Sequence, residues 1–125
     1  EISECLVGSE MCIRDRENIR RYLSAMDVFL FPSVFEGVPF ALIEAQANGL
    51  ACVMSEAVSE EAVVFPERVR RLSLDRDNIQ WAAAVMAMSS MNREAADLIK
   101  MRLSDAHFNI ETEAKRLKDL YYHTR

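Results

Sequence analysis

Hydrophobic positions along the first half of the chain switch between helical spacing and a short continuous run. Four apolar residues recur at helical spacing near the start: Ile19, Tyr22, Leu23 and Met26. They predict a short helix over residues 17–26. Residues 27–31 (DVFLF) then form an apolar run that Pro32 and Ser33 end. A continuous rather than alternating run is typical of a strand covered on both faces, as in a parallel sheet.

A second helix and strand follow at once. Pro39 stands where the first turn of a helix tolerates proline, because that position has no intrahelical use for an N–H. Residues 40–48 are strongly apolar, and Gly49 fits a C-terminal cap. Residues 50–55 (LACVMS) are the next candidate strand. Strand, short helix and strand in this order predict a βαβ unit with parallel strands.

The second half of the chain predicts mainly helices. Residues 59–62 are expected to form a single capped turn, and residues 69–74 alternate like a half-exposed edge strand. Asp77 is a candidate N-cap. Three helices are then indicated by apolar faces: Ile79, Ala82, Ala83 and Met86; Ala95, Leu98, Ile99 and Leu103; Ile110, Ala114, Leu117 and Tyr121. The fold class is therefore α/β, a Rossmann-like parallel sheet with flanking helices and a helical C-terminal end.

Composition narrows the function classes. The formal net charge of −5 argues against nucleic acid as the main partner, because phosphate backbones select basic surfaces. Cys5, Cys12 and Cys52 form no even disulfide framework, which favours a reducing, cytoplasmic setting. No apolar run approaches the roughly 18 residues of a membrane span. His107 and His123 are too far apart, and have too few acidic or cysteine neighbours, to make a metal site, so none is expected and both are interpreted as surface or interhelical histidines.

Residues 1–16 (EISECLVGSEMCIRDR) need separate treatment. They show neither helical nor strand periodicity, and the string resembles a translated sequencing-adapter tract. We therefore interpret residues 1–16 as a non-native leader and exclude them from fold reasoning. The native domain is expected to occupy residues 17–125.

The tract from Pro32 to Gly49 carries most of the candidate chemistry. The N–H groups of Phe40 and Ala41 lie in the first helical turn, where they have no intrahelical acceptors. The helix dipole adds partial positive charge there, which favours a phosphate. Glu36 and Glu44 stand on either side, and carboxylates are good acceptors for sugar hydroxyls. A phosphorylated sugar or nucleoside is the ligand this pattern indicates, although two solvated helix-end charges would show the same spacing.

The tract also resembles a family signature. The sequence from Pro32 (PSVFEGVP) followed by EAQANG, ending at Gly49, is similar to the signature of the family 4 retaining glycosyltransferases, especially capsule and exopolysaccharide enzymes. The resemblance covers about residues 17–123 and includes LSAMDVFLFPS, ending at Ser33. It implies a GT-B fold of two Rossmann-like domains, of which this chain would be an incomplete C-terminal, donor-binding domain.

The resemblance implies a role for each matching residue. Glu44 would hold the ribose hydroxyls of a nucleotide-sugar, and Glu36 would contact the donor sugar beside the reacting carbon. Gly37 and Val38 would line the sugar pocket. Pro39 departs from members with an N–H at its position, since proline donates no hydrogen bond. This difference concerns which sugar is bound.

The resemblance further implies that the amides of Phe40 and Ala41 hold the diphosphate of a UDP- or GDP-sugar, with no metal cofactor. The acceptor, a glycan or lipid-linked sugar, would bind a separate N-terminal domain. The full enzyme would be cytoplasmic or peripheral at the inner face of the membrane. An Arg and a Lys that hold the donor phosphates in the family lie upstream of the matching region, so the 125-residue chain alone is expected to be inactive. A non-catalytic Rossmann-like domain that binds a nucleotide or partner is the alternative.

Two other clusters have simpler interpretations. The basic cluster Arg68, Arg70 and Arg71 is interpreted as solvated charge on an exposed edge strand, in preference to a contact with a phosphate or lipid headgroup. Four methionines are interpreted as core filler: Met86, Met88, Met91 and Met101.

Overall fold

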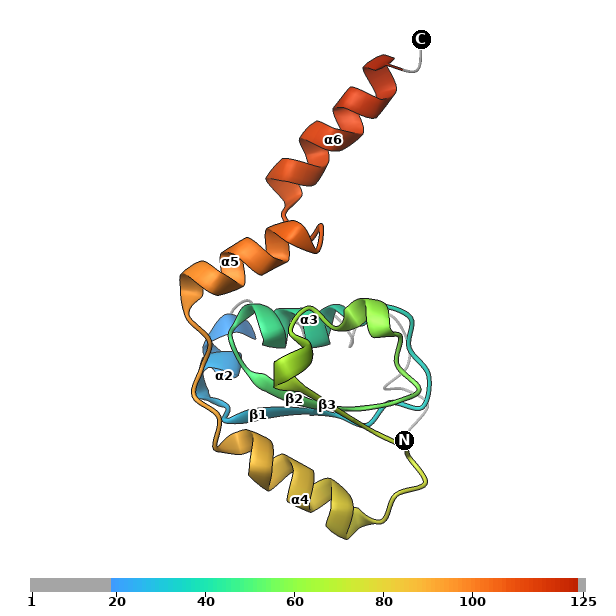
Figure 1. Ribbon diagram of the computed structural model, residues 1–125, viewed down its shortest axis with the longest axis vertical. Helices are drawn as coiled ribbons and strands as arrows, with labels where there is room; N and C mark the ends of the chain where they lie inside the picture. The colour runs from blue at the N-terminus through green and yellow to red at the C-terminus, as the bar shows by residue number, and fades with distance from the viewer. Residues whose placement is uncertain (1–18, 124–125) are drawn as a thin grey trace, which may run out of the picture.

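A parallel sheet forms the centre of the molecule (Figure 1). The computed structural model describes residues 19–123. Within this range three strands lie in the order β1 (Val28–Phe31), β2 (Ala51–Ser55) and β3 (Val69–Leu72). Both neighbouring pairs are parallel. Every residue of β2 is buried, as expected for the central strand.

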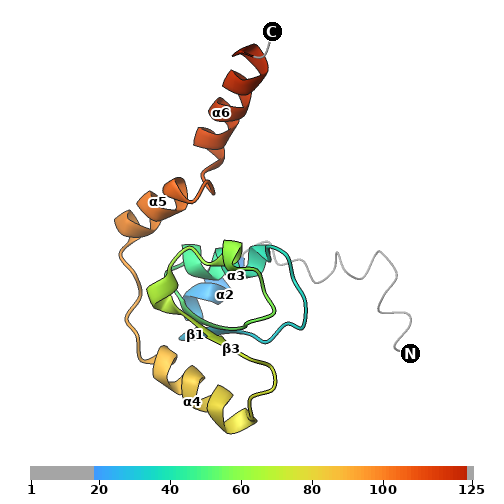
Figure 2. The same cartoon turned by 45° about the vertical axis from the view of Figure 1, so that its right-hand side comes forward.

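Helices cover both faces of this sheet. The described helices are α2 (Ile19–Ala25), α3 (Phe40–Ala47), α4 (Asn78–Ser89), α5 (Ala96–Asp105) and α6 (Ile110–His123), with 3-10 turns η2 (Glu60–Ala62) and η3 (Pro66–Arg68). α3 lies on one face and α4 on the opposite face, while α5 and α6 lead away from the sheet (Figures 1 and 2). The predicted α/β class with a helical C-terminal end is confirmed. The leader over residues 1–16 lies outside the described residues.

Local signals in the sequence placed most elements within two residues. β1, α3 and β2 form the predicted βαβ unit. Gly49 follows α3 with φ of 75°, a left-handed conformation that glycine adopts without strain. The side chain of Asp77 accepts a hydrogen bond from Gln80 N at 2.8 Å, as an N-cap should. Ser59 likewise accepts from Glu61 N and caps η2.

The core lies mainly between the sheet and α3. Its buried residues are Leu23, Leu42, Ala45, Leu50, Cys52, Met54, Val58 and Ala62. A smaller cluster of Val64, Phe65 and Ile99 joins α5 to the segment between η2 and η3. β1 is less covered than its apolar run predicted, because Leu30 is 47% exposed. β1 is an edge strand of the described sheet, with β2 as its only neighbouring strand, and its other edge is therefore not covered by a strand.

α4 turns a different face to the sheet from the one predicted. Its half-buried apolar residues are Trp81, Ala84, Val85 and Met88, whereas Ile79, Ala82, Ala83 and Met86 are exposed. The helix is apolar on nearly all sides, so its sequence pattern did not identify the packed face. Met86 and Met101, 71% and 54% exposed, are therefore not core filler, while Met88 and Met91 are half-buried.

α6 is helical as predicted, but its apolar face is not packed against the rest of the described chain. Ile110, Leu117 and Tyr121 are all more than half exposed. The interpretation of both histidines as surface residues is confirmed, since His107 and His123 are exposed.

The basic cluster was interpreted wrongly for Arg68. Arg68 is 6% exposed, and its guanidinium donates to Gly49 O at 3.1 Å and Asn92 O at 2.5 Å. It also faces Glu94 at 3.7 Å. Arg68 therefore joins the end of α3 to the segment between α4 and α5. Arg70 is exposed, as predicted.

Candidate functional site

The signature tract lies at the carboxyl edge of the parallel sheet. β1 ends at Phe31, and the loop that follows leads directly into α3. Ser55, the last residue of β2, donates a hydrogen bond from its hydroxyl to Ser33 O, which ties this loop to the neighbouring strand. Glu36 forms an isolated parallel bridge with Val58. The loops after β1 and β2 therefore run side by side where α/β folds usually bind ligands.

Glu36 presents its carboxylate to solvent at this edge. The Ser33 hydroxyl donates to Glu36 Oε1 at 3.4 Å, an exposed contact that orients the side chain. A Cβ on the neighbouring Gly37 would meet no protein atom within 4 Å. The protein itself therefore does not require a glycine here, and the open space beside Glu36 is available to a ligand. Val38 is 37% exposed next to it.

The first turn of α3 offers two free amides. Pro39 is the N-cap residue of α3. The sequence predicted it in the first turn of the helix, so it stands one position earlier than expected. Its carbonyl accepts from Leu42 N and Ile43 N. Phe40 N and Ala41 N have no acceptor among the described residues. Because both residues are exposed, these two N–H groups are open to a ligand at the positive end of the helix dipole.

Glu44 lies on the same outward face of α3 as Phe40, four residues later and therefore one turn along. It lines a cavity of about 220 Å³ between α2 and α3, whose other lining residues are Ile19, Arg20, Leu23, Ala47 and Asn48. Glu36 does not line this cavity. The two carboxylates thus flank the free amides from the loop side and from the helix side rather than sharing one cavity.

Gln46 is the residue of the tract whose role sequence reasoning missed. It is 1% exposed, and all its amide contacts are satisfied. Its Nε2 donates to Ala62 O at 2.7 Å and Leu42 O at 3.2 Å, and its Oε1 accepts from Val64 N at 2.9 Å and Phe65 N at 3.1 Å. Gln46 holds the segment after η2 against α3. The partners that it reaches beyond α3 lie 16 to 19 residues away, so no local pattern indicates this role.

The thiol of Cys52 takes no part in the candidate site. Burial raises the pKa of Cys52 to about 12, and the positive charge of Arg68 opposes this rise only in part. A thiolate is the reactive form of cysteine, so this thiol is inert near neutral pH.

The comparison with known families decides the classification. A model described as glycosyl transferases group 1 matches residues 7–91. The chain belongs to this family. The α/β fold with its parallel sheet and flanking helices agrees with one Rossmann-like half of a GT-B enzyme.

This glycosyl transferases group 1 chain is similar to three curated relatives, and each match covers a different share of its length. The putative glycosyltransferase EpsF of Bacillus subtilis (strain 168) is 29% identical over 116 residues, 93% of this chain and 30% of the relative. The amylovoran biosynthesis glycosyltransferase AmsK of Erwinia amylovora is 32% identical over 121 residues, 90% of this chain and 28% of the relative. A UDP-Gal:alpha-D-GlcNAc-diphosphoundecaprenol alpha-1,3-galactosyltransferase of Escherichia coli is 43% identical over 52 residues, 42% of this chain and 13% of the relative.

The chain spans less than a third of the length of each of these relatives. No solved structure gave a significant match. Across residues 19–123, no helix is both long and apolar enough to cross a bilayer. Within that same stretch, no three His, Cys, Asp or Glu side chains are grouped so that they would hold a metal ion.

Proposed function

We propose that this chain is the donor-binding portion of a retaining hexosyltransferase that uses a UDP- or GDP-sugar to build exopolysaccharide, capsule or lipopolysaccharide. The pair of free amides at Phe40 and Ala41, flanked by Glu36 and Glu44 at the carboxyl edge of the sheet, carries the proposal. Such an arrangement offers a place for a diphosphate with hydroxyl-bearing groups on both sides.

Each residue has a proposed role. The amides of Phe40 and Ala41 bind the diphosphate and stabilise the negative charge that develops as the nucleoside diphosphate leaves. Glu44 accepts hydrogen bonds from the ribose hydroxyls. Glu36 contacts the donor sugar beside its anomeric carbon, in the open space that Gly37 and Val38 border.

The proposed donor chemistry needs no metal or other cofactor, because the helix dipole and the backbone amides face the diphosphate. The acceptor, a glycan or lipid-linked sugar, is proposed to bind a further domain at the cytoplasmic face of the membrane. The name of the Escherichia coli relative contains UDP-Gal, so a uridine donor is the first to test.

The ribose role is tested by titrating UDP into the 125-residue chain by calorimetry. Glu44→Gln removes a charge-assisted hydrogen bond, which is worth about 1.5–3 kcal/mol, and should weaken UDP binding roughly 10- to 100-fold. Glu61→Gln is the matched control, because Glu61 is also an exposed glutamate but does not line the cavity that Glu44 lines. UDP lacking the 2′ and 3′ hydroxyls should bind the wild type weakly and lose nothing further in Glu44→Gln.

The sugar role is tested in parallel with Glu36→Gln. This variant should weaken UDP-galactose or UDP-glucose binding and leave UDP binding unchanged, since Glu36 contacts only the sugar. If neither UDP nor GDP binds the wild type, or if Glu61→Gln weakens UDP as much as Glu44→Gln does, the proposed donor site is wrong.

A further inference from the structure

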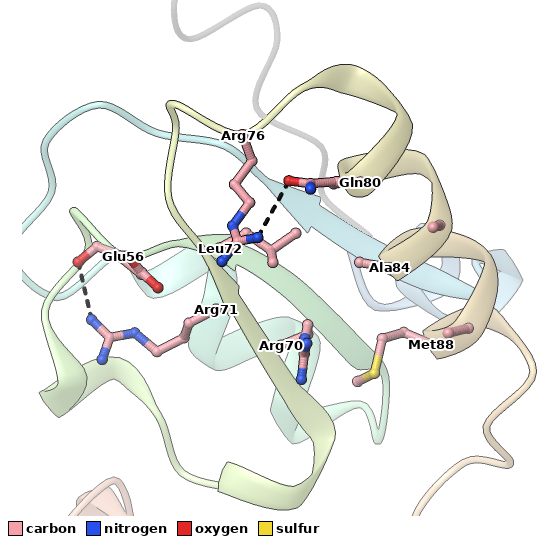
Figure 3. A pocket seen from close by; sticks show the side chains of 10 residues that line it. Glu56, Arg70, Arg71, Leu72, Arg76, Gln80, Ala84 and Met88 are labelled. Carbon is pink, nitrogen blue, oxygen red and sulfur yellow. Dashed lines mark hydrogen bonds between the residues drawn. The ribbon is translucent and has the colours of Figure 1, made fainter.

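A second cavity lies on the other side of the sheet, between β3 and α4 (Figure 3). Its volume is about 690 Å³. It faces α4, whereas the candidate donor site lies with α3 on the opposite face of the sheet (Figure 1). The two sites therefore share no lining residue, and the argument for this cavity does not rest on the proposed donor function.

Three arginine residues line the cavity, and they come from two parts of the chain. Arg70 and Arg71 are neighbours on β3, and Arg76 stands in the loop before α4. The side chain of Arg70 makes no hydrogen bond or ion pair with any described residue. The guanidinium of Arg76 donates only to the neutral Gln80 amide at 3.4 Å. Two positive charges thus face the cavity without a bonded counter-charge.

Arg71 is held in place by other contacts. Its guanidinium pairs with the Glu60 carboxylate and donates to Glu56 O at 3.0 Å and Val58 O at 3.1 Å. Its Nε is buried and has no hydrogen-bond partner among the described residues. Successive side chains of a strand point to opposite faces, so Arg71 points away from α4 while Arg70 points toward it, and Arg71 is not counted among the charges that face the cavity.

The acidic residues nearby do not neutralise this charge. Glu56 is the one carboxylate among the residues that line the cavity, and it is exposed. Asp75 and Asp77 keep their negative charge while they accept hydrogen bonds from the Ser73 hydroxyl and Gln80 N, but neither lines the cavity. The lining therefore keeps an excess of positive charge.

The wall opposite the arginines belongs to α4 and is apolar: Ala83, Ala84, Ala87 and Met88. Leu72 on β3 adds an apolar side chain on the same side as Arg70. The short alanine side chains of α4 leave the space open, and Figure 3 shows Arg70 lying near Met88 across it. A ligand that fills this cavity needs an anionic end near the arginines and an uncharged body against α4.

We propose that the cavity between β3 and α4 binds the phosphoryl group of a ligand whose remaining part is uncharged and apolar. Phosphate fits this set better than a carboxylate, because its several oxygens can accept from guanidinium forks on different sides. A small soluble phosphate ester and the headgroup of an anionic lipid share this chemistry.

The experiment measures two kinds of binding to the 125-residue chain. Calorimetry with inorganic pyrophosphate tests a soluble ligand, and sedimentation with phosphatidylcholine vesicles, with and without phosphatidylglycerol, tests a lipid surface. Arg70→Gln and Arg76→Gln should each weaken the binding about fivefold, the effect of removing one basic residue near an anionic surface. Arg21→Gln, which removes one exposed arginine on α2, is the matched control and should change little.

Each outcome decides the proposal. Pyrophosphate binding that depends on Arg70 and Arg76 but not on Arg21 supports it with a soluble ligand, and vesicle binding with the same dependence supports it with a lipid. Absence of binding in both arms overturns it. Binding that falls equally in Arg21→Gln, or that is unchanged in Arg70→Gln and Arg76→Gln, also overturns it. Because Glu44 and the α3 amides are intact in all these variants, UDP binding reports separately on the donor site.

Discussion

Replacing Gln46 by leucine should destabilise the fold strongly, although the two side chains are similar in size. The amide of Gln46 satisfies three backbone groups that have no other partner among the described residues: Ala62 O, Val64 N and Phe65 N. These three residues are at most 8% exposed. Leucine leaves all three backbone groups without a hydrogen-bond partner at once, and water has little access to replace the lost amide.

The magnitude follows from the cost of orphaned groups. Each buried backbone donor or acceptor left without a partner costs about 1–3 kcal/mol. The Leu42 carbonyl is not orphaned, because as a helical carbonyl it can still accept from the backbone of α3. Allowing for relaxation of the segment after η2, we expect Gln46→Leu to lower the free energy of unfolding by about 3–5 kcal/mol. This is a large part of the stability of a typical domain, about 5–15 kcal/mol.

Urea unfolding followed by circular dichroism measures this loss. Gln80→Leu is the control, because Gln80 is exposed on α4 and its side chain satisfies no buried backbone group. The control should change the free energy of unfolding by less than about 0.5 kcal/mol. A loss below about 1 kcal/mol in Gln46→Leu would refute the role given to the amide.

Two further predictions concern stability. The guanidinium of Arg93 donates to four carbonyls at the ends of α2 and α3: Leu23 O, Ser24 O, Met26 O and Asn48 O. Arg93→Ala should cost about 2 kcal/mol in urea unfolding, against less than about 0.5 kcal/mol for Arg21→Ala, and equal losses would contradict the capping role. The second prediction concerns Cys52, whose pKa is higher in the folded protein than in the unfolded chain. The stability that the neutral thiol contributes is therefore fully present below pH 9 and is lost as pH rises toward 12. Between pH 8 and 10.5 the wild type should lose about 2 kcal/mol more than Cys52→Ala, and parallel pH profiles would contradict the burial of the neutral thiol.

The sequence predicted those features that depend on neighbouring residues. The βαβ unit, the glycine after α3 and the Asp77 cap follow from short patterns, and all were confirmed. The packed face of α4 was predicted wrongly, because an evenly apolar helix carries no periodic signal. Arg68 was also misassigned, since its partners at Gly49 and Asn92 are 19 and 24 residues distant. Such contacts arise only when the elements assemble.

For the candidate site too, the sequence predicted the local features and missed those that depend on how the elements pack. The exposed amides of Phe40 and Ala41 followed from the helix start, and the exposure of Glu36 and Glu44 followed from the signature. That Glu44 shares a cavity with α2 depended on how the two helices pack, which the spacing of residues within the tract does not contain.

α3 divides the signature tract between a buried face and an exposed face, and we propose that the exposed face binds the donor. Leu42, Ala45 and Gln46 point into the protein and are at most 1% exposed, whereas Phe40 and Glu44 point outward. Helical periodicity separates the two sets, so residues only two positions apart lie on opposite faces of the helix. Glu44→Gln and Gln46→Leu therefore form a matched pair of substitutions on one helix. The first should weaken nucleotide binding and leave unfolding unchanged. The second should lower stability, and the fraction that remains folded should still bind UDP, because neither the free amides nor Glu44 is altered.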